Sequence, residues 1–242
     1  MSLLAVEDLV VRYGALTALR GASIRVEEGE VFFVTGPNGA GKSTLLRAIA
    51  GVVRPAAGAI VLEGRSVVGE TPEAIARRGF SMAPEGRQVF GSLTVEENLR
   101  LGAGMRPDRG AVARDLAQVY EVFPMLAARR GGPAGLLSGG QQQMLVIARA
   151  LMTAPRLIAI DEPSLGLAPV VIDHVYELLL RLRAERGLTL LVVEQSSTRA
   201  MMTGGRMALL RSGRVVLEGE ARALGASDAL ERAYFGYDES PA

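Results

Sequence analysis

The 242-residue sequence contains no cysteine, a single histidine and a single lysine, although lysine and arginine together number 27. Without cysteine, the chain can form no disulfide, iron–sulfur cluster or thiolate zinc site, which is consistent with a reducing compartment. No stretch reaches the roughly 18 uninterrupted apolar residues that a membrane span needs. The longest apolar runs, such as residues 188–193, have the length of a strand. The protein is therefore expected to be soluble by itself.

An excess of charge of one sign is also lacking, since 27 basic residues face 26 acidic ones and no block of like charge occurs. This argues against nucleic acid as the main partner, because a phosphate backbone requires a concentrated basic surface. Glu7 and Asp8 interrupt the N-terminal segment before the apolar core of a signal peptide is complete. We therefore expect this segment to stay on the protein.

Strand patterns dominate the first sixty residues. The runs LLAVEDLVVRY and ASIRVE, separated by a turn-like GAL, alternate as in a half-exposed antiparallel sheet. The run at 31–35 is uniformly apolar, which predicts a strand covered on both faces. A glycine-rich loop, a helix ending at Gly51 and a strand in AIVLEG are expected next.

The middle of the chain changes character. Between about residues 86 and 152 strand signals nearly vanish, and helices are predicted at 94–102, 111–123 and 138–152. Strands return at 157–161 and 188–193 with a helix at 169–186 between them, an order that favours a parallel sheet. Residues 207–219 predict a hairpin that turns at Ser212 and Gly213. We therefore expect an α/β fold with an inserted helical segment.

The single lysine lies in the glycine-rich loop GPNGAGKST, which has the spacing of a P-loop between an apolar strand and a helix. Glycines let backbone N–H groups turn toward phosphate oxygens, and the helix N-terminus adds the positive end of its dipole. A compact ammonium reaches the β and γ phosphates as a point charge, a role that a planar guanidinium does not fit. The predicted nucleotide-binding residues are Gly36, Pro37, Asn38, Gly39, Ala40, Gly41, Lys42, Ser43 and Thr44.

Two acidic residues complete a candidate site for hydrolysis. Asp161 and Glu162 end the strand in LIAIDEP, and open α/β sheets bind ligands at the carboxyl ends of their strands. We expect Ser43 to contact Mg²⁺ directly, Asp161 to hold it through water, and Glu162 to polarise the water that attacks the γ phosphate. A lone acidic pair would be an ordinary strand end, but with a complete P-loop it predicts ATP hydrolysis.

The motif LSGGQ at 137–141, between the P-loop and DEP, makes the chain resemble the ATP-binding-cassette (ABC) ATPases over nearly its whole length. The resemblance implies a RecA-like P-loop NTPase core with an antiparallel β subdomain and an α-helical subdomain at about 86–152. It implies one nucleotide-binding domain over residues 1–242, without a regulatory C-terminal domain. Two such cassettes meet head to tail, so the signature residues would complete the partner's γ-phosphate site; they are Ser138, Gly139, Gly140 and Gln141. Ser138 can also cap the helix that follows.

The resemblance assigns further positions. Tyr13 resembles, by its spacing, the aromatic residue that stacks on adenine in the family, although a tyrosine in a strand more often serves in core or edge packing. The segment 164–169 resembles a loop that contacts the partner cassette, and 94–99 lies where the family faces its membrane subunits.

Two positions depart from the family pattern. Glu85 stands where the family usually has the glutamine of its Q-loop, and its carboxylate changes the charge at that position. Gln195 stands at the position of the switch histidine, and an amide can bond a phosphate but cannot take up a proton near neutral pH. The single histidine, His174, is expected to be a surface or packing residue of its helix.

The segments PEGRQVF, LTVEENL, SLGLAP and VEQ resemble the LivF-type ATPases of bacterial branched-chain amino acid importers. The resemblance implies ATP and Mg²⁺ as cofactors and a homodimer or heterodimer bound to permease subunits. It also implies an indirect link to a periplasmic or lipid-anchored solute-binding protein, and a cytoplasmic location, peripheral on the cell membrane.

Three other functions stay open. Urea and short-amide importers have similar ATPases. A soluble ABC protein acting on DNA or the ribosome would predict a coiled-coil insertion, a second cassette or a basic surface, which the sequence does not show. A regulatory ATP-binding subunit would follow if Gln195 slowed the site, although Glu162 argues against an inactive site.

Overall fold

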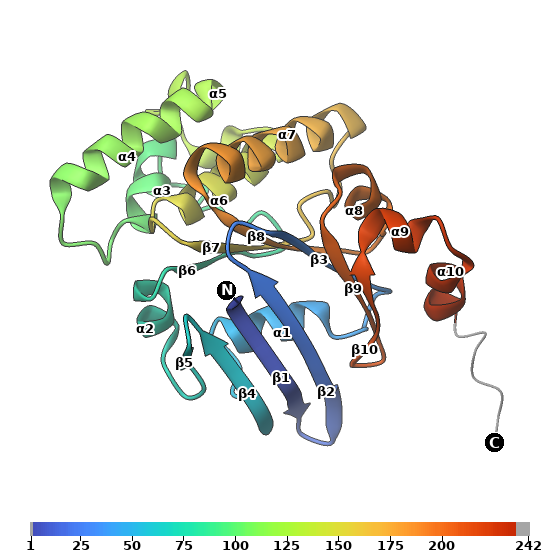
Figure 1. Ribbon diagram of the computed structural model, residues 1–242. Helices are drawn as coiled ribbons and strands as arrows, with labels where there is room; N and C mark the ends of the chain where they lie inside the picture. The colour runs from blue at the N-terminus through green and yellow to red at the C-terminus, as the bar shows by residue number, and fades with distance from the viewer. Residues whose placement is uncertain (1, 236–242) are drawn as a thin grey trace, which may run out of the picture. The chain divides into compact units, whose positions relative to one another are not determined.

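The computed structural model describes residues 2–235 and divides into two compact units. The first unit combines the N-terminal part of the chain through Pro72 with the part that begins at Thr189, and the second comprises Glu73–Leu188. Both units contain strands and helices (Figure 1). The α/β class predicted from the sequence is therefore confirmed, whereas the boundaries of the helical subdomain stay a prediction.

An antiparallel sheet forms one part of the first unit (Figure 1). Its strand order is β2-β1-β4-β5, with the bounds β1 Ser2–Tyr13, β2 Leu16–Glu27, β4 Ala57–Leu62 and β5 Arg65–Ser66. The predicted antiparallel pairing of the first two strands is confirmed. The second strand is longer than predicted, because the turn ends before Leu16 and Leu19 is already fully buried.

The other strands of the first unit surround β3, all of whose residues are buried as predicted. Strand β3 is parallel to β8 and β9, and β10 pairs antiparallel with β9; the bounds are β3 Val31–Thr35, β8 Thr189–Glu194, β9 Arg206–Arg211 and β10 Arg214–Glu220. The predicted hairpin turn at Ser212 and Gly213 is confirmed, with φ values of 49° and 80° that suit a two-residue hairpin turn. The unit's helices are α1 Lys42–Ile49, α8 Thr198–Thr203, α9 Ala221–Gly225 and α10 Asp228–Phe235.

The second unit contains the parallel pair β6, Phe80–Ala83, and β7, Leu157–Asp161. The three helices predicted in its middle part are confirmed as α3 Val95–Gly102, α4 Arg109–Val122 and α6 Gly139–Leu151. Shorter helices are α2 Pro72–Arg77 and α5 Pro124–Ala127, with a 3-10 turn at Ala134–Leu136. Helix α7, Pro169–Arg186, has its predicted bounds, with proline at its first position and Gly187 in the left-handed conformation after its last.

Helices α3 and α6 approach each other closely at Gly102. A Cβ atom there would lie 3.0 Å from the carbonyl carbon of Arg149 and 3.0 Å from Cβ of Met152. Any side chain at Gly102 would therefore push the two helices apart. Within residues 2–235, none of the helices has the length and the apolar character that crossing a membrane requires.

Candidate functional site

The P-loop connects β3 to α1, and its glycines adopt backbone conformations that other residues rarely reach. Gly36, Gly39 and Gly41 have φ values of 149°, 79° and 108°. Gly41 is also the N-cap of α1, and the first turn of a helix leaves N–H groups without intrahelical acceptors. Asn38 and Gly39 at the tip of the loop are exposed. The loop therefore presents backbone donors next to the positive end of a helix dipole, which is the environment that binds phosphate.

Neighbouring strands fix the shape of this loop. A Cβ atom on Gly41 would lie 2.8 Å from the carbonyl oxygen of Ala18 and 2.8 Å from Cδ2 of Leu19, both in β2. On the other side, Gly213 in the β9–β10 turn donates its N–H to the carbonyl oxygen of Ala40 at 2.9 Å. The P-loop is held between β2 and the β9–β10 hairpin.

Lys42 is turned onto the loop that precedes it. The residue is 5% exposed, and its Nζ donates to the carbonyl oxygens of Gly36 at 2.8 Å and Pro37 at 3.2 Å. Its positive charge is therefore held against the first two residues of the loop, Gly36 and Pro37. Ser43 and Thr44, which follow in the first turn of α1, are partly exposed.

Gln195 leaves the sheet beside the P-loop. Strands β3 and β8 are parallel neighbours, with Thr35 paired to Glu194, so the residues that follow each strand emerge at the same edge. Gln195 is exposed there. Tyr13, at the end of β1, is 42% exposed. Tyr13 is therefore not a core residue, and its ring has an exposed surface on which a planar base could stack.

The predicted acidic residues follow strands of the second unit. Strands β6 and β7 are parallel and Ala83 pairs with Ile160, so Glu85 and Asp161 lie at the same edge of this pair. Asp161 is 1% exposed, whereas Glu85 is exposed. Glu162 has a left-handed backbone with a φ of 49°, an uncommon conformation for a residue with a side chain. Such conformations cluster at functional sites.

The signature residues begin helix α6. Ser138 accepts the N–H of Gln141, and the Gln141 side chain accepts the N–H of Ser138, which together form a capping box. The predicted cap is thus confirmed. Gly140 packs closely on α7, since a Cβ atom there would lie 2.5 Å from Cγ1 of Val171. Ser138 itself is exposed, so its face of the helix N-terminus is accessible.

Three residues that the sequence did not single out hold the segment after Glu85. The Asn98 side chain accepts the N–H of Phe90 and donates to the Phe90 carbonyl oxygen, both at 3.0 Å. Arg149 donates to the carbonyl oxygen of Gln88 at 2.7 Å and lies 5.1 Å from the centre of the Phe90 ring. Burial lowers the pKa of this arginine. Arg87, the third, lies against Gly139 at the start of α6.

The position of Asn98 among apolar residues of its helix could have identified it from the sequence as a buried polar residue. It is fully buried on the apolar side of α3, between the buried residues Val95 and Leu99. A polar residue on the buried side of a helix requires partners, which here are backbone groups of the preceding segment. His174, by contrast, is exposed on α7 as expected for a surface residue of a helix.

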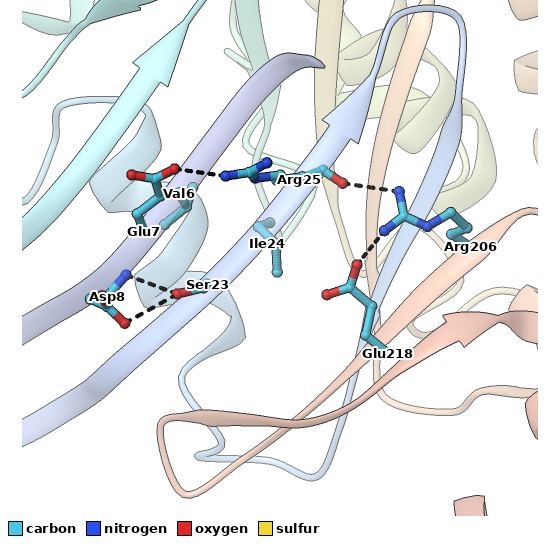
Figure 2. Close-up of a pocket in the computed structure, with 8 residues that line it drawn as sticks. All are labelled: Val6, Glu7, Asp8, Ser23, Ile24, Arg25, Arg206 and Glu218. Carbon is cyan, nitrogen blue, oxygen red and sulfur yellow. Dashed lines mark hydrogen bonds and ion pairs between the residues drawn. The ribbon is translucent and has the colours of Figure 1, made fainter. Parts of the chain in front are cut away.

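A separate pocket of about 370 Å³ lies among strands β1, β2, β9 and β10 (Figure 2). Its charged groups form ion pairs with one another: Arg25 pairs with Glu7 at 3.0 Å, and Arg206 pairs with Glu218. Arg206 also reaches Glu30 at 3.4 Å; burial raises the pKa of Glu30, and this arginine opposes the shift. The pocket therefore consists of ion pairs that join strands, and we do not include it in the candidate site.

Known proteins are similar to this chain over most of its length. Residues 19–165 match the model of the ABC transporter family. The chain is similar to the high-affinity branched-chain amino acid transport ATP-binding protein BraG of Pseudomonas aeruginosa, with 42% identity over 97% of this chain and 100% of that protein. It is 34% identical to the probable branched-chain amino acid transport ATP-binding protein LivF of Archaeoglobus fulgidus, over 93% of this chain and 94% of that protein.

A solved structure of an ABC transporter cassette is also similar to this chain. The crystal structure of the ADP conformation of MJ1267, an ATP-binding cassette of an ABC transporter, is similar to this chain with a TM-score of 0.87 and 28% identity, covering 98% of this chain and 99% of that one. The predicted family and the predicted P-loop NTPase fold are both confirmed. The chain belongs to the ABC transporter family, as a nucleotide-binding ABC ATPase subunit.

Proposed function

We propose that the chain is the ATPase subunit of an importer for branched-chain amino acids. The observation that carries the choice of solute is the similarity to BraG, which extends over the full length of that protein. The names of BraG and of the LivF relative both refer to branched-chain amino acid transport. Two relatives from different organisms thus support the same solute class.

The P-loop residues Gly36–Thr44 are proposed to bind the triphosphate of ATP, with Tyr13 stacking on adenine. The positive-φ glycines and the inward ammonium of Lys42 support this role. Ser43 and Asp161 are proposed to hold Mg²⁺, directly and through water respectively, because hydroxyl and carboxylate oxygens are the ligands that this hard cation prefers. When bound, Mg²⁺ would neutralise charge on the phosphates.

Glu162 is proposed to act as the general base that orients and polarises the attacking water. Its unusual backbone conformation supports a specific functional placement of the side chain. Glu85 and Gln195 are proposed to occupy the Q-loop and switch positions. Since the amide of Gln195 cannot take up a proton near neutral pH, proton transfer at this site is assigned to Glu162 and water.

Two cassettes are proposed to close around ATP, each placing its residues Ser138–Gln141 on the γ phosphate held by the other. The capped, exposed N-terminus of α6 supports this role, since such an end attracts an anion. ATP can drive closure only if it binds the closed pair more tightly than the open one. Hydrolysis and phosphate release would then remove the preference for the closed pair.

The partners are proposed to be a second ABC cassette, identical or different, and permease subunits that receive solute from a periplasmic or lipid-anchored binding protein. Phe90 and Leu101, near the segment 94–99, are 52% and 50% exposed, which supports a docking role for this part of the chain. The proposed location is the cytoplasmic face of the membrane.

The decisive experiment purifies the chain together with its permease subunits and solute-binding protein and measures ATP turnover with different solutes. Leucine, isoleucine or valine is expected to raise turnover, whereas urea and short amides are expected to have no effect. Stimulation by urea alone would replace the proposed solute by the related importer class. Turnover that continues unchanged without membrane subunits or solute would favour a soluble ABC ATPase.

A further inference from the structure

Arg87 connects three segments of the second unit. Its Nη2 donates to the carbonyl oxygen of Gly166 at 2.8 Å, in the loop that precedes α7. Its guanidinium also covers Gly139, where an added Cβ atom would lie 2.7 Å from Cζ of Arg87. Arg87 itself follows Glu85 and Gly86 in the segment after β6. A single side chain therefore joins this segment to the signature helix and to the loop at 164–168.

The arrangement has features that packing alone does not favour. Arg87 has a φ of 56°, in the left-handed region that costs energy for a residue with a Cβ atom. Its positive charge lies at the N-terminus of α6, which carries the positive end of the helix dipole. The Gly166 carbonyl oxygen offsets part of this repulsion by accepting one N–H. The left-handed backbone of Arg87 and the repulsion between its charge and the helix dipole therefore both act where the signature residues begin.

Because Gly139 has no side chain, it leaves room for the guanidinium of Arg87. Any side chain at Gly139 would occupy the space that the Arg87 side chain fills. Arg87 also limits Gly166, whose added Cβ atom would lie 3.1 Å from Nη2 of Arg87 in a residue with a φ of 66°. Gly139 at the start of α6 and Gly166 in the loop before α7 thus both lie against one arginine.

We propose that Arg87 is a positioning residue for assembly of the cassette pair: it holds Ser138–Gly140 and the loop at 164–168 in one fixed arrangement. The inference rests on the proposed function, in which the signature residues contact the partner's γ phosphate. A cassette without this link would still bind ATP at its P-loop, because the residues proposed to hold the triphosphate belong to the loop at 36–44 and to the first turn of α1. It would present a less ordered α6 N-terminus and a less ordered loop at 164–168 to its partner, and the cost of ordering them on assembly would weaken closure.

The test compares Arg87→Ala, Arg87→Lys and Gly139→Ala with the parent chain in the assembled transporter. ATP affinity of the separate chain is expected to change less than about twofold. Turnover of the assembled transporter is expected to fall about tenfold in Arg87→Ala, the effect of losing one charged hydrogen bond. Arg87→Lys should recover part of the turnover, since an ammonium can still donate to the Gly166 carbonyl oxygen. Arg181→Ala, which removes an exposed ion pair of α7, is the matched control and should retain turnover.

Combining Arg87→Ala with Gly139→Ala distinguishes positioning from general damage. Gly139→Ala displaces the guanidinium, so the loss of turnover that it adds in the Arg87→Ala background should be smaller than the loss that it causes alone. Additive losses in the double variant would overturn the inference. So would an equal loss of ATP affinity and turnover in Arg87→Ala, or wild-type turnover in that variant.

Ser138→Arg separates failure of this inference from failure of the proposed function. If Ser138→Arg abolishes turnover while Arg87→Ala and Gly139→Ala do not change it, only the positioning role of Arg87 is refuted. If Ser138→Arg also leaves turnover unchanged, the signature residues do not act on a partner's nucleotide, and both proposals fail together.

Discussion

Replacement of Lys42 by alanine is expected to lower ATP affinity by two to three orders of magnitude. Two unit charges about 4 Å apart interact by about 4 kcal/mol at the effective dielectric constant of a protein surface. Loss of about 3–4 kcal/mol corresponds to a factor of roughly 10²–10³ in the dissociation constant. The structure supports a value at this scale, because Lys42 is only 5% exposed and its ammonium already donates to two loop carbonyl oxygens.

The assay titrates the purified chain with a fluorescent ATP analogue in the presence of Mg²⁺. Lys42→Arg is the control, since it keeps the charge but replaces the compact ammonium by a planar group, and it should bind more weakly than the parent chain. Because Lys42 is the single lysine, an amine reagent can label only this side chain and the terminal amine. ATP should protect Lys42 from the reagent, as measured by mass spectrometry. Unchanged affinity in Lys42→Ala, together with labelling that ATP does not slow, would refute the assignment of the P-loop.

Three further predictions concern other parts of the chain. Glu162→Gln should bind ATP with parent affinity but turn over about 10²–10⁴ times more slowly, and steady-state turnover near the parent rate would remove Glu162 from the role of base. Gly102→Ala should lower the free energy of unfolding by about 1–3 kcal/mol in denaturant titrations, because α3 and α6 touch there, whereas Gly131→Ala, with open space around it, is the control and should have a much smaller effect. Burial, with the nearby Glu96 carboxylate, raises the pKa of Tyr120 to about 12. The folded state therefore favours the neutral phenol, so the free energy of unfolding should fall as the pH rises from about 10 toward this value. In an ultraviolet absorbance titration of the folded protein, Tyr120→Phe should remove the tyrosine that ionises near pH 12.

The features that the sequence predicted correctly depend on local patterns. The four apolar residues of β3, the buried Thr35 that follows them and the glycines of the loop specify a buried strand and a tight loop within a short stretch of chain. The bounds of α7 follow from Pro169 at its start and Gly187 at its end, which act on their own neighbours. Ser138 and Gln141 form their cap within four residues. In each case the interacting groups are close in sequence, so the pattern contains the interaction.

The features that the sequence did not predict depend on residues far apart in the chain. Arg87 contacts a carbonyl oxygen 79 residues away, and Arg149 contacts one 61 residues away. An arginine in either segment would be expected at the surface, because no local pattern distinguishes it from the other 25 arginines. The short helices α8 and α9 also escaped prediction, since six and five residues are too few to show a clear helical period. Helix α10 was not predicted either.

The P-loop itself combines both kinds of information. Its spacing identifies it from nine consecutive residues, but its shape depends on β2 and on the β9–β10 turn, which lies more than 160 residues away. Gly213 accepts the N–H of Arg20 at 2.8 Å while donating to Ala40 at 2.9 Å, so one turn residue connects β2 to the loop. An added Cβ atom on Gly213 would lie 2.6 Å from the carbonyl oxygen of Ala18, which leaves no room for a side chain. The shape of the loop is therefore a property of the folded first unit, and a peptide with the sequence GPNGAGKST would contain the backbone donors without their arrangement.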